Sequence, residues 1–497
     1  MNKHYYLTTL LICILTVITH ANNISVNSLS FQNKDTENKT VEIKVNITWD
    51  NSWKLTEAPG NWDAAWVFFK YKVGNGQWSH VKLNYDQLDA GHYALNANID
   101  VSNDDNNGNA HGAFVYSDTP IQQQSVNYDL SFVWNYGANA VNDDDKIKIR
   151  AFAIEMVYVP QGAYHLGSGG NEKGHFYKYN GSTDTDTYYV DSENSITIGN
   201  QSNNLYYDTA SINHQGDQTG VLSESFPKGY NAFYCMKYEI TQAQFTAFLS
   251  TIDFDDATNL IRKQEKGRNL IVNTDSVVYS DQPYVPIQYL SWQGLAAYLD
   301  WAALRPITEL EFEKACRGTQ TPVPNEYVWG NTLLNENDYT TVNEDTKSES
   351  ISSNFSMNTG NANYKKNSNG TYKPYRTGKF SGYSTGASLT RVQAGATYYG
   401  IMEMSGNVSE KVVTVGHEKG RVFTGEHGDG HLCPDVGLAD VENWPCNDTA
   451  LGSGVRGGSY NRSKNLLETS NRKLAARNYY QEYRQLGGRG GRTAPTE

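Results

Sequence analysis

The chain has 497 residues, a formal net charge of −13 and, in its composition, 35 Tyr and 43 Gly. An acidic chain with no basic cluster outside its C-terminus is a poor match for a polyphosphate, so we exclude nucleic acid as its main partner. A chain of this length exceeds one ordinary hydrophobic core, which predicts two or more domains.

The first residues have the pattern of an export signal. Lys3 and His4 precede an apolar run at 10–15, and Thr19 and Ala21 place small residues where a signal peptidase reads the chain. The run is too short to span a bilayer, and no later segment is apolar enough to do so. We expect a signal peptide over 1–21, no transmembrane segment, and an exported protein that is periplasmic, extracellular or at the cell surface.

Four cysteines remain once the signal peptide is removed. An even number in an exported chain permits disulfides. Cys433 and Cys446 flank one short stretch, and a bridge between them would contribute on the order of 3 kcal/mol. Cys235 and Cys316 lie in apolar contexts typical of buried thiols. The absence of any Cys-x-x-Cys spacing argues against structural zinc.

Residues 22–153 are predicted to form an Ig-like β-sandwich. Short strand patterns recur at 40–48, 65–73, 78–83, 128–134 and 146–154. The first alternates apolar and polar residues, and the second and third flank the turn Gly74-Asn-Gly76 as a hairpin. The acidic stretch 103–108 lacks the bidentate Glu of a calcium loop and is predicted to be a solvated turn. No linker follows, so the last strand should run directly into the next domain.

The second half alternates strands, helices and long loops. Residues 169–226 are rich in Gly, Ser, Asn and Asp and predict a long surface excursion. Capping boxes at Thr241/Gln244 and Thr308/Glu311 predict two helix starts, and Ser291 predicts a third.

Eight short motifs follow one another in this half. They stand at 156–168, 238–241, 285–292, 305–313, 327–330, 361–364, 400–410 and 456–460. The two most distinctive are Gly400-Ile-Met-Glu-Met-Ser-Gly-Asn-Val-Ser-Glu410 and Arg456-Gly-Gly-Ser-Tyr460, and Gly488-Arg489 closes the series. Their order resembles the formylglycine-generating-enzyme (sulfatase-modifying factor) domain family. The resemblance implies an α+β, C-type-lectin-like fold over 154–497.

The resemblance also locates the family's chemistry. Its oxygenases hold copper(I) with two cysteines shortly after the Arg-Gly-Gly-Ser motif. An ungapped alignment puts Arg462 and Leu467 at those positions, and no cysteine follows Cys446. A soft d¹⁰ ion requires thiolates, so no copper is expected. No catalytic or cofactor-binding residue is therefore assigned.

Calcium is the second property that the resemblance implies. The family's ligand positions correspond here to Glu403, Gly406, Val408 and Glu410, the two central residues through main-chain carbonyls. Hard oxygen ligands from a tight turn suit calcium. Glu403 stands where the family has Asn or Asp, and Lys411 where it has Trp. An empty, well-packed turn remains the alternative.

One further segment could bind a metal. His427, Asp429 and His431 alternate along the chain and would face one ion if the segment were extended. The intervening glycines equally predict a tight loop. Such a site would support an alternative function, a metal-dependent oxidoreductase of the same family with an altered, non-cysteine metal site.

The favoured function is a secreted, non-catalytic binding or structural protein with a protein or glycan ligand. The tract 472–492, rich in Arg, Tyr and Gly, offers two interpretations. Its arginines could pair with acidic side chains, which we favour, or the tract could be a diversified ligand-binding face of the kind found in lectin-fold variable proteins.

Overall fold

A computed structural model describes residues 24–86, 90–213, 215–261, 268–269, 271–274, 277–366, 372–382, 389–434, 436–479 and 482–495. The predicted signal peptide, 1–21, lies outside these residues. No helix in the described part of the chain is long and apolar enough to cross a membrane.

The N-terminal region is largely β-strand, and its first sheet has six strands in the order β1-β2-β10-β5-β8, with β6 beside β10. Their bounds are Ser25–Asp35 (β1), Thr40–Lys54 (β2), Leu83–Asn84 (β5), Tyr93–Ala94 (β6), Asn109–Ala110 (β8) and Ile121–Asn135 (β10). The predicted alternation is confirmed in β2, where Val41, Ile43, Val45 and Ile47 are buried between less buried neighbours.

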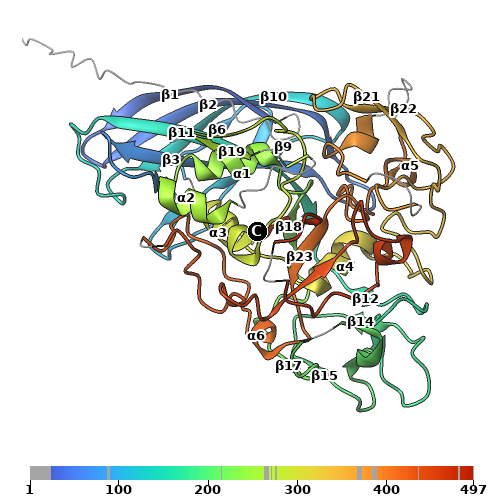
Figure 1. Cartoon of the computed structure of the whole chain (residues 1–497). Coiled ribbons are helices and arrows are strands. Elements are labelled where there is room, and N and C mark those ends of the chain that lie inside the picture. Colours follow the sequence, from blue (N-terminus) through green and yellow to red (C-terminus); the bar gives the residue numbers. More distant parts are fainter. Residues whose placement is uncertain are drawn as a thin grey trace, which may run out of the picture.

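The second sheet has seven strands in the order β26-β18-β11-β3-β9-β7, with β4 beside β3. Their bounds are Asp63–Val73 (β3), Ser79–His80 (β4), Ala97–Asp100 (β7), Ala113–Ser117 (β9), Ile147–Val159 (β11), Phe233–Met236 (β18) and Gly491–Thr493 (β26). Both sheets are antiparallel and enclose one apolar core, which is consistent with a β-sandwich (Figure 1).

Strand β11 carries the second sheet from one half of the chain into the other. It pairs with β3 from Ile147 to Val157, and at its far end Met156–Val159 also pair with β18. The expected domain boundary between 153 and 154 therefore lies inside a strand. The predicted absence of a linker is confirmed.

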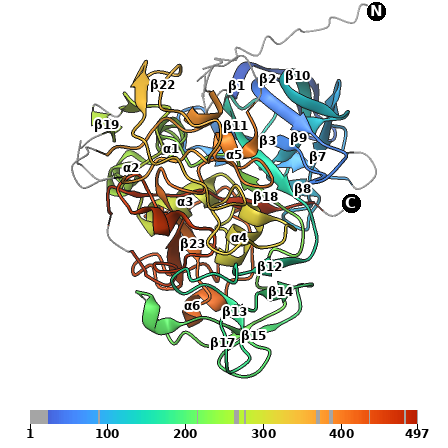
Figure 2. The same ribbon diagram turned by 90° about the vertical axis from the view of Figure 1, so that its right-hand side faces the viewer.

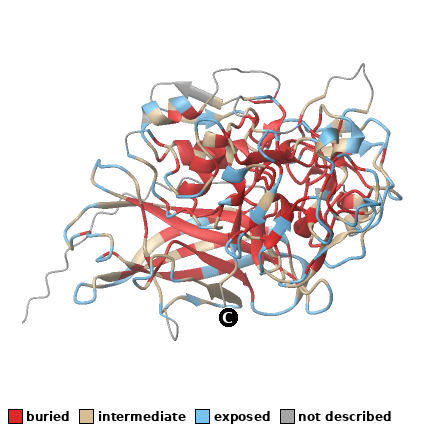
Figure 3. Ribbon diagram, turned by 90° about the horizontal axis from the view of Figure 1, so that it is seen from below, coloured by how far each residue is buried: buried red, intermediate tan, exposed pale blue. Residues whose placement is uncertain are grey.

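Both faces of this second sheet are buried. In β3, Ala65, Val67 and Phe69 face the sandwich core, whereas Trp66 and Phe68 belong to the core that also holds the helices of the second half. Two-faced burial explains the nearly continuous apolar run of this strand. Helices α1 (Gln242–Leu249) and α3 (Trp292–Trp301) lie on the face opposite β1, β2 and β10 (Figures 1 and 2). Buried residues fill the middle of the molecule (Figure 3).

The hairpin after β3 differs from the prediction in extent. Only Ser79 and His80 pair with β3, and Leu83 pairs instead with β10 in the other sheet. The chain crosses between the sheets because Val81 and Leu83 both pack into the sandwich core. The predicted strand 78–83 is therefore two short strands.

The described part of the second half has six helices, and three of them begin where the capping residues predict. Their bounds are Gln242–Leu249 (α1), Phe254–Leu260 (α2), Trp292–Trp301 (α3), Glu309–Arg317 (α4), Arg391–Ala394 (α5) and Glu418–Arg421 (α6), with 3₁₀ turns at Thr209–Ser211, Lys379–Gly382 and Lys464–Leu467. Both predicted capping boxes are formed, and Ser291 caps α3.

The remaining strands form small sheets. They are Tyr164–Leu166 (β12) with Tyr188–Val190 (β14); Tyr177–Lys178 (β13), Ile196–Ile198 (β15), Leu205–Tyr206 (β16) and Gly220–Leu222 (β17); Ile271–Thr274 (β19) with Val277–Ser280 (β20); Thr340–Val342 (β21) with Ser350–Ser353 (β22); and Ser409–Val413 (β23), Ser453–Arg456 (β24) and Leu486–Gly487 (β25). The stretch 169–226 is thus only partly a surface excursion, because Phe176, Leu205 and Tyr207 are buried in the larger core.

The disulfide predicted between Cys433 and Cys446 is not formed. Both are free thiols, as are the buried Cys235 and Cys316. Each of the first two starts a turn of its own: the carbonyl of Cys433 accepts from Gly437 N, and that of Cys446 accepts from Ala450 N, both at 2.9 Å. The flanking position of the two cysteines in the sequence does not bring them together.

Candidate functional site

The two most distinctive motifs lie side by side in one small sheet. Strand β23 pairs with β24 so that Glu410 is opposite Arg456. The turn before β23 is joined to the turn after β24, since Gly406 N donates to Gly457 O and Tyr460 N donates to Asn407 O, both at 2.8 Å. The motifs define one structural unit although about fifty residues separate them.

Gly406 is required by close approach as well as by conformation. Its φ is +98°, and a Cβ at this position would lie 2.5 Å from the carbonyl oxygen of Asn363. Asn407 follows with a φ of +59°, a conformation that Asn tolerates better than most residues.

The side chain of Asn407 connects three segments. Its Oδ1 accepts from Tyr375 N at 2.8 Å and from Asn363 Nδ2 at 3.1 Å, and its Nδ2 donates to Glu239 Oε2 at 2.6 Å. Glu239 Oε1 also accepts from Val408 N at 2.8 Å. We did not predict this role for Glu239; the available signal was a Glu inside the apolar segment 233–240, since a fully buried Glu is rare unless it is paired.

Glu403 points one carboxylate oxygen at a backbone donor and leaves the other without a partner. Its Oε1 accepts from Gly378 N at 2.7 Å, whereas Oε2 is buried and makes no hydrogen bond. Among the described residues, no hydrogen bond ends on the carbonyl oxygens of Gly406 or Val408. Three of the four expected calcium ligands therefore retain free oxygen lone pairs.

Glu410 differs, because both of its oxygens are bound to Arg489, at 2.6 and 2.7 Å. Burial raises the pKa of Glu403 to about 7 and raises the pKa of Glu410, and the pKa of Glu239 is raised well above its usual range by burial and by these two carboxylates. The turn is therefore rich in hard oxygen atoms, and Arg489 is the cation that pairs with its Glu410. This donor set fits a calcium ion that shares Glu410 with Arg489.

The resemblance assigns the family's cysteine pair to Arg462 and Leu467, two residue types that do not bind copper(I). Leu467 is buried, and its carbonyl accepts from Ser405 Oγ at 2.6 Å. Arg462 is half-buried, and its carbonyl accepts from Lys365 N at 2.9 Å. The apolar cluster that includes Leu467 also contains Cys235 and Cys316. Burial raises the pKa of Cys235 to about 12 and that of Cys316 well above its usual range, which disfavours the thiolate that copper(I) needs.

The structure brings together only part of the set His427, Asp429 and His431. His431 Nδ1 lies 3.4 Å from Asp429 Oδ1. His427 Nε2 instead accepts from Thr493 N at 3.0 Å, and burial together with Arg492 and Arg305 holds its pKa well below the usual range. In the described part of the chain, Asp429 is grouped with Asp300 and Asp440 instead.

Arg456 forms ion pairs with two glutamates inside the fold. Its Nη1 donates to Glu309 Oε2 at 3.2 Å, and its Nη2 donates to Glu313 Oε1 at 2.9 Å. Arg472 also binds Glu309, at 2.7 and 2.9 Å, and Arg492 pairs with Asp104. All three arginines are buried. The favoured interpretation of the tract 472–492 is therefore confirmed for the arginines that pair, Arg472, Arg489 and Arg492.

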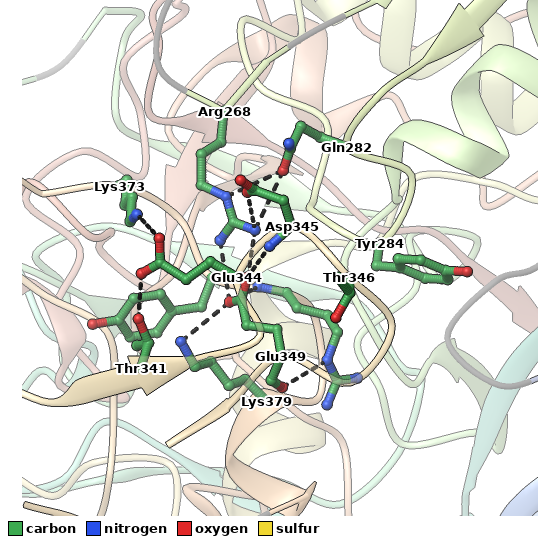
Figure 4. A network of polar contacts seen from close by, with 12 residues as sticks. Arg268, Gln282, Tyr284, Thr341, Glu344, Asp345, Thr346, Glu349, Lys373 and Lys379 are labelled. Atoms are coloured by element: carbon green, nitrogen blue, oxygen red, sulfur yellow. Dashed lines mark hydrogen bonds and ion pairs between the residues drawn. The ribbon is translucent and has the colours of Figure 1, made fainter. Parts of the chain in front are cut away.

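A second polar network (Figure 4) is linked to the Asn407 turn through the segment 373–378, where Tyr375 N donates to Asn407 Oδ1 and Arg376 N donates to Glu349 Oε1. Its centre is Glu349, fully buried, which pairs with Arg268 and lies 3.1 Å from Lys379 Nζ. These charges hold the pKa of Glu349 down at about 2 in spite of its burial. The network connects loop segments that have little regular structure. It thereby helps to fix the position of the Asn407 turn.

Lys411 is a buried cation without an acid partner among the described residues. It is 1% exposed, and its Nζ donates to Tyr479 O at 2.8 Å. Burial lowers its pKa to about 7. The resemblance places it where the family has Trp.

Replacing Lys411 with Met is expected to raise the free energy of unfolding by about 1–2 kcal/mol, because Met fills similar space without a buried charge. Urea unfolding at pH 7 measures the difference. The exposed Lys419 is the matched control, and Lys419→Met should change stability by less than about 0.5 kcal/mol. A loss of stability in Lys411→Met would mean that the hydrogen bond to Tyr479 outweighs the cost of burial.

The comparison with models of protein families supports the resemblance that the motifs indicate. A family model for the sulfatase-modifying factor enzyme 1-like domain matches residues 210–489, more than half of the chain. The chain therefore belongs to the sulfatase-modifying factor enzyme 1-like family. No curated protein matches it at a significant level.

Proposed function

We propose that this chain is an exported, non-catalytic binding or structural protein that uses the family's C-type-lectin-like scaffold, preceded by an Ig-like β-sandwich. The observation that carries the proposal is the pair Arg462 and Leu467 at the positions of the copper-binding cysteines. The bound partner is a protein or glycan ligand outside the cell, at its surface or in a periplasm. Strands of both halves belong to one sheet, which supports a rigid rather than a hinged connection between the halves.

Calcium belongs to the same proposal. Glu403 and the carbonyls of Gly406 and Val408 would hold it, together with Glu410. Its role would be to neutralise buried carboxylates and fix the turn. The unpartnered Oε2 of Glu403 supports this assignment.

The test is copper(I) binding by competition with a chromophoric chelator, together with oxygen consumption in the presence of a cysteine-containing peptide. We expect no tight copper(I) site and no peptide-dependent oxygen uptake. The half-buried Cys433 and Cys446 are the thiols most open to adventitious copper, so Cys433→Ser/Cys446→Ser is the matched control. Tight copper(I) binding that survives in this control, with peptide oxidation, would overturn the proposal.

The alternative, a metal-dependent oxidoreductase, makes a different prediction, which elemental analysis of the purified mature chain tests. It requires stoichiometric iron or copper that is lost in His427→Ala/His431→Ala. The proximity of Asp429 and His431 is its support, and the hydrogen bond of His427 to Thr493 N stands against it.

A further inference from the structure

Three ionisable side chains from neighbouring strands of the second sheet meet in the interior of the molecule. Asp63 begins β3, Glu155 lies in β11 and Lys237 directly follows β18, and these strands are adjacent in the order β18-β11-β3. Lys237 Nζ lies 3.0 Å from Glu155 Oε2 and 3.2 Å from Asp63 Oδ2. Asp63 is 0% exposed and the other two residues are 4% exposed, so one ammonium is shared by two buried carboxylates.

The backbone register brings these groups together. Asp63 pairs with Val157 and Glu155 pairs with Ala65, so the two carboxylates project from the same face of the sheet. Lys237 N donates to Glu155 O at 3.0 Å, which extends the pairing of β18 with β11 by one residue. The amine and both carboxyl groups are therefore positioned by paired strands.

The carboxyl group of Asp63 is oriented by three further donors. Its Oδ1 accepts from Ser52 Oγ at 2.7 Å and from Trp53 N at 3.0 Å. Its Oδ2, which faces Lys237, also accepts from Trp49 Nε1 at 3.1 Å. Two fixed donors on one oxygen stabilise negative charge that develops there, so Oδ1 lies in an environment of the kind that promotes attack on a carboxyl carbon.

Glu155 is placed to relay protons. Its Oε2 accepts from the Lys237 amine, whereas its buried Oε1 makes no hydrogen bond with any described residue. Burial raises the pKa of Glu155 to about 7, so this carboxyl group can take up and release a proton near neutral pH. Burial lowers the pKa of Lys237, but Glu155 and other acidic neighbours outweigh burial and raise it overall. The amine therefore needs a base before it can act as a nucleophile, and Glu155 is in contact with it.

The surroundings of the amine are aromatic. Lys237 Nζ lies 4.8 Å from the centroid of the Trp53 ring and 5.5 Å from that of the Tyr238 ring. A buried ion pair is costly because both charges lose their hydration. Joining the amine to the Asp63 carboxyl group removes both charges, and a nucleophile held in contact with its electrophile reacts far faster than the same groups do in solution.

We propose that Lys237 and Asp63 form an intramolecular isopeptide bond between Nζ and Cγ, with Glu155 as the proton relay. Nζ gives a proton to Glu155, and its lone pair forms the N–Cγ bond while negative charge moves to Oδ1. Glu155 transfers this proton and a second one from Nζ to Oδ2. The Cγ–Oδ2 bond then breaks, its electron pair stays with the oxygen, and one water molecule leaves.

The balance of this reaction is closed without a co-reactant. An ammonium and a carboxylate become one amide and one water molecule, and Glu155 ends in the protonation state in which it began. The bond would join residues 174 positions apart, one in the N-terminal sandwich and one in the second half of the chain. The two halves would then stay connected through this bond even in the denatured chain.

Mass spectrometry of the full mature chain, with its N-terminal residue determined, tests the proposal. We expect the denatured wild type to be lighter than its sequence by the mass of one water molecule. A protease digest should contain one branched peptide in which Lys237 is joined to Asp63, and trypsin should not cleave after Lys237. Lys237→Arg and Glu155→Gln should have their full sequence mass, with near-UV circular dichroism as the check that each variant is folded. The wild-type measurement decides the question even if neither variant folds.

Two controls accompany the variants. Lys419→Arg, at an exposed lysine, should lose one water molecule as the wild type does. Lys379 is an internal control, because its Nζ lies 3.1 Å from Glu349 Oε1. The pKa of Glu349 is about 2, so this carboxylate stays ionised near neutral pH, and we expect no branched peptide there.

A wild-type chain of full sequence mass would overturn the proposal. A loss of water that persists in Lys237→Arg would also overturn it, since a succinimide formed at an Asp has the same mass change without using the lysine. Complete formation of the branched peptide in Glu155→Gln would contradict the proton relay.

Discussion

Arg489→Met is expected to lower the free energy of unfolding by about 3–5 kcal/mol. The guanidinium of Arg489 is fully buried and pairs with both oxygens of Glu410. It also donates to the carbonyls of Met236, Lys237 and Met402, at 2.8, 3.2 and 2.8 Å. Removing it leaves a buried carboxylate and several carbonyls without donors, which is the costly case for a buried ion pair.

Denaturant unfolding of the single and double variants tests the cause. In Arg489→Met/Glu410→Met the lone carboxylate is gone, so we expect this variant to be more stable than Arg489→Met by at least about 1 kcal/mol. Arg484→Met, at an exposed arginine, is the matched surface control and should be within about 0.5 kcal/mol of the wild type. If Arg489→Met stays within about 1 kcal/mol of the wild type, the buried carboxylate of Glu410 must be neutralised or hydrogen-bonded by another group.

Trp66→Ala is expected to lower the free energy of unfolding by about 3–5 kcal/mol and to destabilise both halves of the chain together. The indole is buried between β3 and the second half, where Nε1 donates to Ala302 O at 2.8 Å. Its ring packs on Phe114 at 4.7 Å between centroids, and the Arg492 guanidinium lies 4.4 Å from the ring centroid. The core that it fills is shared by the two halves.

Equilibrium unfolding followed by far-UV and near-UV circular dichroism measures this effect. Both signals should shift together in Trp66→Ala, as one transition, because no linker separates the halves. Tyr93→Ala, on the 60% exposed Tyr93 of the same domain, should shift neither by more than about 0.5 kcal/mol. Two separate transitions, with only the first displaced, would contradict the shared core.

Local chemistry explains which elements were predictable. The helix starts at Thr241, Ser291 and Thr308 follow from side chains that satisfy backbone donors within three residues. The alternation in β2 likewise depends only on neighbours along the strand. Strand pairing with residues far away in the sequence could not be predicted in this way. The predicted strand 78–83 is an example, because its two halves join different sheets.

By itself, the sequence determined the family, through the order of motifs that ends in Arg456–Tyr460 and Gly488-Arg489. These are properties of residue type and order. Only the tertiary structure decided that Glu410 is held by Arg489, that Glu239 supports the Asn407 turn and that Asp300 gathers Asp429 and Asp440. Such partners lie 79 to 168 residues apart, and spacing alone does not encode which charges meet when loops fold onto a common core.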